Sequence, residues 1–352
     1  MLIKKIEIEN LTVFNTLAID VSSNLNVFIG RNGTGKTQLL KFIYMTLISS
    51  IKRGDWKQSQ LGLWKKDNLS EVFFGSKFAQ IGNFKLLFDK ETERVYELKK
   101  GASLSEFDPQ FPHVYNEFIT NKGDLDIFEK ISRKNVFIPA KDMLTHSKGL
   151  LEMEEHYEKS MPFDRSYLDI INKARQWKLD KMPHLAKAIA PILEDLMEGV
   201  VEIHSEAFFI KNRDNKLIPF AHEAEGIKKI GLLWQLLMNG NITTGSVLLW
   251  DEPETNINPH LIPELVKIIL ELSRNGVQIF LSTHDYFLSK YLEVLSSETD
   301  KILFHALHHT TTDGVQCETN EKFEHIDNND ILNSMIKLYD DEVEKVMGCK
   351  RQ

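Results

Sequence analysis

Residues 30–37 constrain the fold of this chain more than any other part of its sequence. They read Gly30-Arg31-Asn32-Gly33-Thr34-Gly35-Lys36-Thr37 and match the pattern G-x-x-x-x-G-K-[ST] at every fixed position. An apolar run at 25–29 precedes this loop, and apolar residues at helical spacing follow it from 39 to 48. In such a strand, loop and helix, backbone N–H groups point at phosphate oxygens. The sequence therefore predicts an α/β fold with a phosphate site at this P-loop.

Two side chains of the P-loop have predicted roles at that site. We expect Lys36 to reach the β- and γ-phosphates of a nucleotide, and the Thr37 hydroxyl to ligate Mg²⁺, a hard cation that prefers oxygen. ATP with Mg²⁺ is therefore the predicted ligand, and the rest of the loop is expected to line its phosphates. The alternative is a glycine-rich turn that matches by chance, and the flanking strand and helix argue against it.

A second motif places carboxylates at the end of an apolar strand. The run at 247–250 leads into the acidic turn, Asp251-Glu252-Pro253-Glu254. Open α/β sheets bind ligands at the carboxyl ends of their strands. We expect Asp251 to hold Mg²⁺ and Glu252 to polarise the water that attacks the γ-phosphate. Glu254 is predicted either to support the metal site from behind or to be a solvated carboxylate.

A third strand end carries a histidine. The apolar run at 277–281 is followed by Ser282-Thr283-His284-Asp285. We expect His284 to contact the γ-phosphate or the attacking water, because histidine as a residue type can exchange a proton near neutral pH and this one follows a third strand; a structural histidine is the alternative. Asp285 is expected to cap the next helix.

Periodicity divides the rest of the chain into further elements. Short apolar stretches between 71 and 138 predict an antiparallel lobe, and 142–199 reads as helical, with Pro191 expected to kink or interrupt the piece at 185–197. A hairpin is predicted around 212–215, and helices at 224–239 and 259–274, the latter capped by Asn258. One ATPase domain over 1–352 is expected, with these sub-regions: a P-loop lobe at 1–70, an antiparallel β lobe at 71–141, a helical insertion at 142–199, a lobe carrying the acidic turn and His284 at 200–300, and a strand and helix at 301–352.

Composition sets limits on partners and compartment. The formal charge of -8 argues against a protein that coats nucleic acid by bulk electrostatics, although a local basic stripe stays open. No apolar run approaches the roughly 18 residues of a membrane span, and the N-terminus alternates like a strand, so a cytoplasmic protein without membrane contact is expected. Cys317 and Cys349 lie far from any metal-ligand spacing and are expected to be reduced thiols. The histidines at 305, 308 and 309 are taken as part of a strand followed by a polar loop, not as a metal site.

Together these motifs resemble the ABC-ATPase heads of the SMC, RecF and overcoming-lysogenisation-defect (OLD) group over nearly the whole chain. The resemblance rests on Walker A at 30–37, Walker B with an adjacent glutamate at 247–252, a D-loop-like stretch at 256–260 and the switch His284. It implies a RecA-like parallel sheet core, an antiparallel β lobe and a helical insertion. More narrowly, 137–144 and 250–256 resemble stand-alone ATPases of bacterial anti-phage defence systems, of which the PARIS and Septu-type ATPases are examples.

The resemblance also implies a homodimer, or a larger assembly, with composite ATP sites. In the family, a signature motif with a serine and two glycines meets the γ-phosphate bound by the opposite subunit. Here the matching stretch begins Ala224-Glu225-Gly226, so Gly226 keeps the close backbone approach but the serine is missing. Lys228 or Lys229 is predicted either to compensate or to lie on a solvated helix face. No glutamine occupies the expected Q-loop position, and Asp142 or Lys141 is the nearest substitute.

Two functions follow from the resemblance. In the first, the protein is a nucleotide-gated scaffold or sensor in anti-phage defence that holds a separate effector, expected to be a nuclease acting in trans because the chain ends soon after His284, and that responds to phage-derived protein or DNA. Its candidate partner surface lies in the helical insertion, although solvated helix faces are the simpler account; the basic residues there are Lys173, Arg175, Lys178, Lys181 and Lys187. In the second, it is a RecF-like repair ATPase that clamps DNA between two heads.

Overall fold

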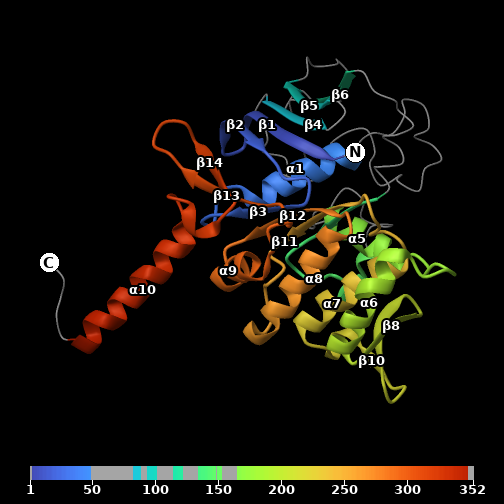
Figure 1. Ribbon diagram of the computed structural model, residues 1–352. Coiled ribbons are helices and arrows are strands. Elements are labelled where there is room, and N and C mark those ends of the chain that lie inside the picture. The colour runs from blue at the N-terminus through green and yellow to red at the C-terminus, as the bar shows by residue number, and fades with distance from the viewer. Residues whose placement is uncertain are drawn as a thin grey trace.

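The computed structural model describes residues 2–48, 82–88, 93–100, 114–121, 134–147, 149–152 and 165–347. The described strands form three sheets, and the described helices lie between and against them (Figure 1). Cys349 and parts of the expected P-loop lobe, antiparallel lobe and helical insertion lie outside these residues.

The central sheet places the motif-bearing strands side by side. Its order is β14-β13-β3-β12-β11-β7, and all neighbours pair parallel except β13 and β14, which pair antiparallel. Every residue of β3, β7, β11 and β12 is buried, which is why these strands read as near-continuous apolar runs. The strands span Leu25–Ile29 (β3), Asn135–Ile138 (β7), Val247–Asp251 (β11), Gln278–Thr283 (β12), Ile302–His309 (β13) and Val315–Asn320 (β14).

One face of this sheet is covered by α1 (Lys36–Ile48) and a second sheet. The second sheet is antiparallel throughout, with the order β2-β1-β4-β5-β6. Buried residues of α1, including Leu39, Leu40 and Ile43, pack in one apolar cluster with β1 and β3. The predicted antiparallel lobe is therefore present, and it includes β1 and β2 as well. The prediction also placed residues 135–138 in this lobe, which is wrong, because β7 pairs parallel with β11 in the central sheet. The strands span Ile3–Leu11 (β1), Phe14–Asp20 (β2), Gly82–Phe88 (β4), Glu93–Lys100 (β5) and Val114–Asn121 (β6).

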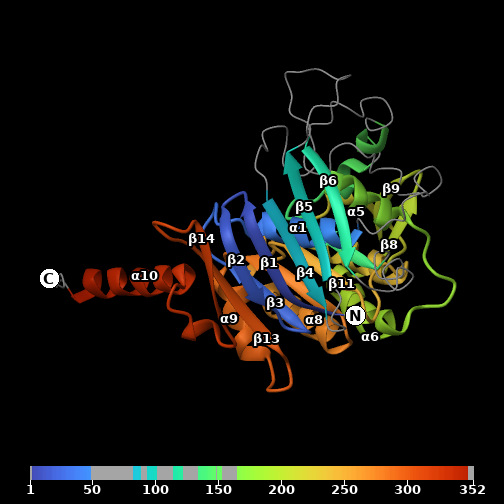
Figure 2. The ribbon, with the colours of Figure 1, turned by 90° about the horizontal axis from the view of Figure 1, so that it is seen from above.

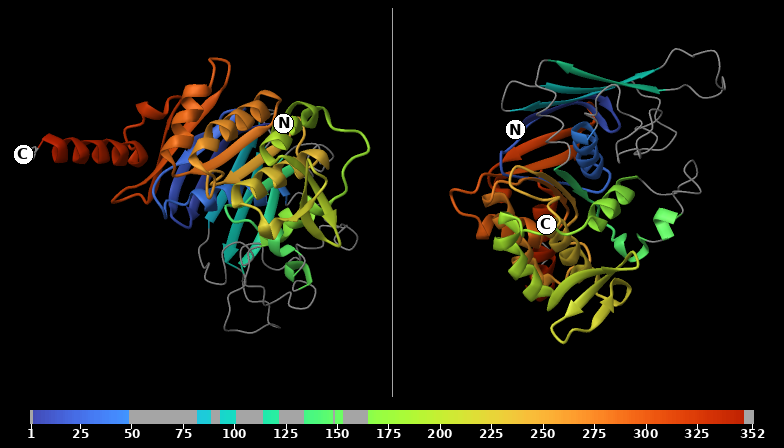
Figure 3. Two further views of the ribbon diagram at one scale, coloured as in Figure 1. Left: turned by 90° about the horizontal axis from the view of Figure 1, so that it is seen from below. Right: turned by 90° about the vertical axis from the view of Figure 1, so that its right-hand side faces the viewer.

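Helices cover the opposite face of the central sheet, as Figure 1 and the right-hand view of Figure 3 show. Their buried apolar residues and those of the sheet form the larger of two core clusters. A small antiparallel sheet, β10-β9-β8, lies at the outer end of this layer. These elements span Arg165–Arg175 (α5), His184–Met197 (α6), Gly199–His204 (β8), Ala207–Asn212 (β9), Leu217–Pro219 (β10), Glu225–Met238 (α7), Ile262–Arg274 (α8) and Tyr286–Leu295 (α9).

Two local predictions about helices need correction, at Pro191 and at the start of the helix predicted at 259–274. Pro191 does not interrupt its helix, because α6 continues through it, with Leu185, Ile189 and Leu193 buried on one face and Pro191 on the exposed face. Before the predicted hairpin, the chain reverses at Ser205 and Glu206, both with positive φ, to pair β8 with β9. The turn at 213–216 then joins β9 to β10, as predicted.

The helix predicted at 259–274 begins differently from the prediction. Residues Pro259–Leu261 form a 3₁₀ turn, in which the Asn258 side chain accepts a hydrogen bond from His260 N at 3.3 Å, and α8 starts only at Ile262. Asp285 caps α9 as expected, because its carboxylate accepts from Leu288 N at 2.6 Å.

The last described helix, α10 (Asp330–Met347), projects from the body of the molecule (Figures 1 and 2). None of its residues is buried; the helix contacts α9, and Ile331 and Leu332 near its start pack against the larger core cluster. Among the helices of the described ranges, none is long and apolar enough to cross a membrane.

Candidate active site

The P-loop joins β3 to α1 with three glycines at positive φ. Gly30 has φ +143°, and a Cβ there would lie 2.3 Å from the Leu307 carbonyl oxygen of the neighbouring strand. Gly35 has φ +88°, and a Cβ there would lie 2.6 Å from the Phe14 ring. At Gly33 a Cβ would meet no atom within 4 Å. The loop is thus packed closely from behind and open at Gly33.

Lys36 lies folded across the P-loop. Its Nζ donates to the carbonyl oxygens of Gly30 at 2.7 Å and Arg31 at 3.0 Å. The residue is 6% exposed, and burial lowers the pKa of its ammonium below the ordinary value. The Thr34 hydroxyl also donates to the Arg31 carbonyl, at 2.9 Å. A cation is therefore held at the inside of the loop, where phosphate oxygens would accept its hydrogen bonds.

Thr37 and Asp251 meet although they are far apart in sequence. The Thr37 hydroxyl lies 2.9 Å from Asp251 Oδ1 and 3.0 Å from Oδ2. Burial raises the pKa of Asp251, while hydrogen bonds donated by Ser282 and Thr37 oppose that rise. A hydroxyl beside one carboxylate fits Mg²⁺, which usually takes few protein ligands and keeps waters and substrate phosphates as the others.

Ser282 was not predicted from the sequence as a site residue. It lies directly opposite Asp251 in the parallel pairing of β11 and β12, which puts its hydroxyl within hydrogen-bonding reach of that carboxylate. The sequence did contain an indication, because Asp251 and Ser282 each directly follow an apolar run, and these runs form adjacent parallel strands.

Glu252 is held in an unusual backbone conformation, with φ +45°. One carboxylate oxygen lies 3.1 Å from His284 Nδ1, and the other accepts from the Thr255 hydroxyl at 3.2 Å. The side chain is 26% exposed, so water reaches it. The structure therefore brings Glu252 and His284 together at the mouth of the site; Thr255 is a partner that the sequence did not indicate.

Glu254 points inward. It is 8% exposed, its Oε1 accepts from the Thr283 hydroxyl at 2.6 Å, and its Oε2 has no hydrogen-bond partner among the described residues. Burial raises its pKa to about 7. The solvated alternative for Glu254 is therefore wrong.

The start of α7 packs onto the turn that follows the acidic residues. A Cβ on Gly226 would lie 3.3 Å from Ile257 Cγ1, so the helix and the turn are in close contact. Ala224 precedes α7 without any side-chain cap bond. The N-terminus of α7 therefore presents backbone N–H groups, which favour an anion.

Neither lysine of this helix lies on a solvated face, so that alternative is wrong. Lys228 and Lys229 are each 5% exposed. Lys228 Nζ pairs with Glu225 Oε1 at 2.7 Å, whereas Lys229 Nζ donates to the Glu252 carbonyl oxygen at 3.0 Å. Burial lowers the pKa of Lys229 to about 8. Both ammonium groups are engaged within their own chain.

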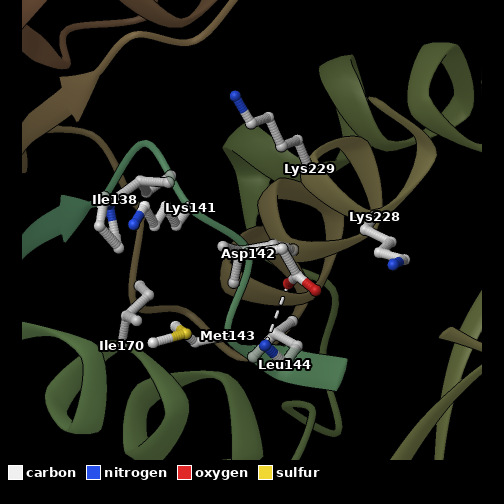
Figure 4. Close-up of a pocket in the computed structure, with 10 residues that line it drawn as sticks. Ile138, Lys141, Asp142, Met143, Leu144, Ile170, Lys228 and Lys229 are labelled. Atoms are coloured by element: carbon white, nitrogen blue, oxygen red, sulfur yellow. Dashed lines mark hydrogen bonds between the residues drawn. The ribbon is translucent and has the colours of Figure 1, made fainter. Parts of the chain in front are cut away.

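Asp142 and Lys141 lie beyond the end of β7, in the wall of a small pocket (Figure 4). Asp142 accepts hydrogen bonds from Leu144 N at 3.0 Å and from the Thr145 hydroxyl at 2.6 Å, so it stabilises its own turn. The pocket wall also includes Ile138, Pro139, Met143, Leu144, Ile170, Lys228, Lys229 and Leu232. A role for either residue in place of the missing glutamine stays a prediction.

The five basic residues of the helical insertion do not form one surface. Lys173 is buried, Arg175 pairs with Glu206 at 2.7 Å, and Lys178 Nζ donates to the Val201 carbonyl at 2.6 Å. Lys181 and Lys187 are exposed. The basic partner surface predicted for this region is therefore reduced to two side chains.

His305 is a buried residue of β13, with its ring nitrogens 2.8 Å from Thr319 Oγ1 and 3.2 Å from Asn26 Oδ1. Burial lowers its pKa to about 3. His308 and His309 end the same strand. The described residues contain no cluster of three or more His, Cys, Asp or Glu side chains that could hold a metal ion. Cys317 is a free thiol whose pKa burial raises to about 12.

A family model described as "AAA domain, putative AbiEii toxin, Type IV TA system" matches residues 25–290. Among curated proteins, the chain is 25% identical over 163 residues to the DNA replication and repair protein RecF of Clostridium botulinum (strain Langeland / NCTC 10281 / Type F), which covers 43% of this chain and 44% of that protein. It is 23% identical over 214 residues to RecF of Aliivibrio salmonicida (strain LFI1238); this match covers 55% of this chain and 58% of that protein. The chain thus spans about half the length of these relatives.

Solved structures of SMC heads share the fold. An SMC head bound to the C-winged helix domain of ScpA superposes with a TM-score of 0.51 at 11% identity, covering 91% of this chain and 98% of that one. An Smc head with an extended coiled coil, bound to the C-terminal domain of ScpA and derived from Pyrococcus furiosus, superposes with a TM-score of 0.50 at 10% identity. This match covers 97% of this chain and 99% of that one. The predicted fold class, an ABC-ATPase head with a P-loop NTPase core, is confirmed.

Proposed function

We propose that this chain binds ATP with Mg²⁺ and hydrolyses it to ADP and phosphate. The chain belongs to the AAA domain family whose model matches residues 25–290, and it has the fold of an ABC-type ATPase. One observation carries the proposal: the Thr37 hydroxyl lies against both oxygens of Asp251, at 2.9 and 3.0 Å, one residue before Glu252. A metal ligand pair and a candidate general base are thereby adjacent at one sheet edge.

Each site residue has a role in this proposal. The P-loop residues, from Gly30 to Thr37, and the N-terminus of α1 bind the phosphates, with Lys36 as the cation among them. Thr37 and Asp251 would hold Mg²⁺, which would supply positive charge to stabilise the phosphate oxygens. Glu252 orients the attacking water and accepts its proton, and His284 and Thr255 orient Glu252.

Substitution of Lys36 tests the binding half of this proposal. Lys36→Ala removes the cation from the inside of the loop, so we expect at least a tenfold loss of Mg-ATP affinity, since charge-assisted hydrogen bonds contribute about 1.5–3 kcal/mol each. Calorimetric titration of wild type and variant measures the affinity, with Lys187→Ala on the exposed face of α6 as the control. Equal affinity in Lys36→Ala and wild type would contradict the assignment of the site.

We further propose a cytoplasmic homodimer, or a larger assembly, in which the N-terminus of α7, with Gly226, faces the phosphates bound by a second copy. Two features support it: the helix begins without a side-chain cap, and Gly226 allows close backbone approach. The missing serine and the engagement of both lysines within the chain mean that α7 would act through its backbone.

For the biological role, we propose a nucleotide-gated scaffold or sensor for a separate effector in anti-phage defence, with a nuclease as the expected effector and a phage-derived protein or DNA as the trigger. The family description, which includes a toxin of a toxin–antitoxin system, supports a partnered defence role. The charge of -8 weighs against direct DNA coating, while the basic surface predicted for an effector is reduced to Lys181 and Lys187.

The similarity to RecF favours a second candidate, a DNA-clamping ATPase in DNA repair. A pull-down of tagged Glu252→Gln protein from its host with Mg-ATP separates the two. A stoichiometric effector-like polypeptide supports the scaffold. DNA without a protein partner supports the clamp, which also predicts DNA-stimulated turnover and binding that weakens steeply with salt.

A further inference from the structure

Lys229 connects α7 to the acidic turn of the same chain. Its Nζ donates to the carbonyl oxygens of Glu252 at 3.0 Å and Pro253 at 3.4 Å, and the residue is 5% exposed. The adjacent Lys228 is equally buried but pairs with Glu225 at 2.7 Å. The two side chains leave the helix in different directions (Figure 4). Only Lys229 of this pair therefore binds the turn that carries the candidate base.

The backbone of Glu252 needs such an anchor. Its φ of +45° is a conformation that non-glycine residues hold only where the surrounding structure imposes it. On the amide side, Glu252 N donates to the Ser282 carbonyl at 3.0 Å. On the carbonyl side, the Lys229 ammonium binds Glu252 O. The residue is therefore fixed from β12 on one side and from α7 on the other.

The same helix touches this turn at a second place. Gly226, three residues before Lys229, packs against Ile257 and the carbonyl oxygen of Asn256. A shift of α7 would consequently move the backbone on which Glu252 stands, while His284 and Thr255 hold the carboxylate at the other end of the side chain.

We propose that Lys229 is a positioning residue for Glu252, which fixes the carboxylate by binding the backbone of the acidic turn. The proposal rests on the proposed hydrolysis with Glu252 as general base. Lys229 acts through the backbone of the acidic turn in its own subunit, and it lies on the helix whose N-terminus is proposed to face the nucleotide of a second copy.

Three variants of the full chain test the role. Lys229→Met keeps the apolar stem and removes the donor, so kcat should fall roughly 10- to 100-fold, the scale expected for a misplaced catalytic group, while KM and Mg-ATP affinity change less than about 3-fold. Lys229→Arg, which keeps donors at that position, should recover most of kcat. Gln235→Met, also buried on α7 but bonded to the Ala174 carbonyl and not to the acidic turn, should leave kcat within about 3-fold of wild type.

A second background separates positioning from general damage. In Glu252→Gln protein the base is already absent, so adding Lys229→Met should change the residual single-turnover rate less than about 2-fold. An equal loss in both backgrounds, or an unchanged kcat in Lys229→Met, would overturn the proposal. If Lys229→Met does not fold, Lys229→Gln replaces it, because its side chain is too short to reach the Glu252 carbonyl. The same two outcomes with Lys229→Gln would overturn the proposal. A wild-type chain without turnover would refute the proposed function instead, and this inference with it.

Discussion

At the scale of single residues, the two glutamates of the acidic turn have opposite surroundings. Glu252 is open to water and held by His284 and Thr255, as a general base requires. Glu254, two residues further on, is buried and binds Thr283. Its raised pKa of about 7 means that the folded chain binds a proton more tightly than the unfolded chain, whose ordinary value is 4.5.

That difference predicts a pH dependence of stability. Between pH 4.5 and about 7 the folded state holds more protons at Glu254, so this residue lowers the free energy of unfolding as pH rises, by up to about 1.4 kcal/mol per pH unit. Glu254→Gln should remove that slope. The lowered pKa of His305 has the opposite effect over part of the same pH range. The quantity to compare is therefore the difference in free energy of unfolding between Glu254→Gln and wild type, measured by urea unfolding at each pH.

Exposed Glu298→Gln is the matched control for this measurement, and it should leave the pH dependence unchanged. If Glu254→Gln and wild type differ by a constant amount from pH 5 to pH 7.5, Glu254 is not protonated in the folded chain.

Part of this residue-level picture could be predicted from sequence. The meeting of Thr37 with Asp251 was expected because each belongs to a motif that ends at the same sheet edge. Ser282, Thr255 and Lys229 were not, because their contacts depend on strand register and on the packing of α7. The amphipathic pattern of that helix does not distinguish a polar side chain that faces solvent from one that faces another element.

At the scale of elements, the P-loop glycines serve different purposes. Gly30→Ala would place a Cβ 2.3 Å from the Leu307 carbonyl at φ +143°, so we expect a loss of several kcal/mol or failure to fold. Gly33→Ala meets no neighbour and should cost only the strain of φ +85°, about 1–2 kcal/mol. Urea unfolding without nucleotide compares them; equal losses would mean that the packing of the loop on β13 is not what Gly30 provides.

Element type followed from periodicity more reliably than element boundaries did. The buried runs at 247–250 and 277–281 are adjacent parallel strands, as their apolar composition indicated. Pro191 was predicted to kink or interrupt α6, yet the helix is not interrupted, because the packing of its buried face outweighs one lost hydrogen bond on the exposed side. The turn at Ser205 and Glu206 lacks the glycine or asparagine that usually marks such a reversal.

At the scale of the whole molecule, a P-loop residue is linked to the projecting α10. Arg31 pairs with Asp330 in the first turn of that helix at 2.7 Å. Sequence patterns predicted the layers around the sheet, since each buried strand and amphipathic helix must find a partner face. They did not predict that α10 would extend from the body, because its amphipathic sequence would equally suit a packed helix.

The composite-site proposal predicts assembly that depends on nucleotide. Glu252→Gln with Mg-ATP should at least double its mass in light scattering after size exclusion, because the bound nucleotide is not consumed. The same protein with Mg-ADP, and Lys36→Ala with Mg-ATP, should remain smaller. An unchanged mass of Glu252→Gln with and without Mg-ATP would argue against a site shared between copies.

The central claim is that Glu252 activates water at a P-loop that binds Mg-ATP. The most direct test is steady-state phosphate release by wild type and Glu252→Gln, measured beside their Mg-ATP affinities. We predict that affinity changes little while turnover falls roughly 10²- to 10⁴-fold, the range for a lost general base. Equal turnover in the two proteins at equal affinity would contradict the assignment of Glu252 and the mechanism built on it.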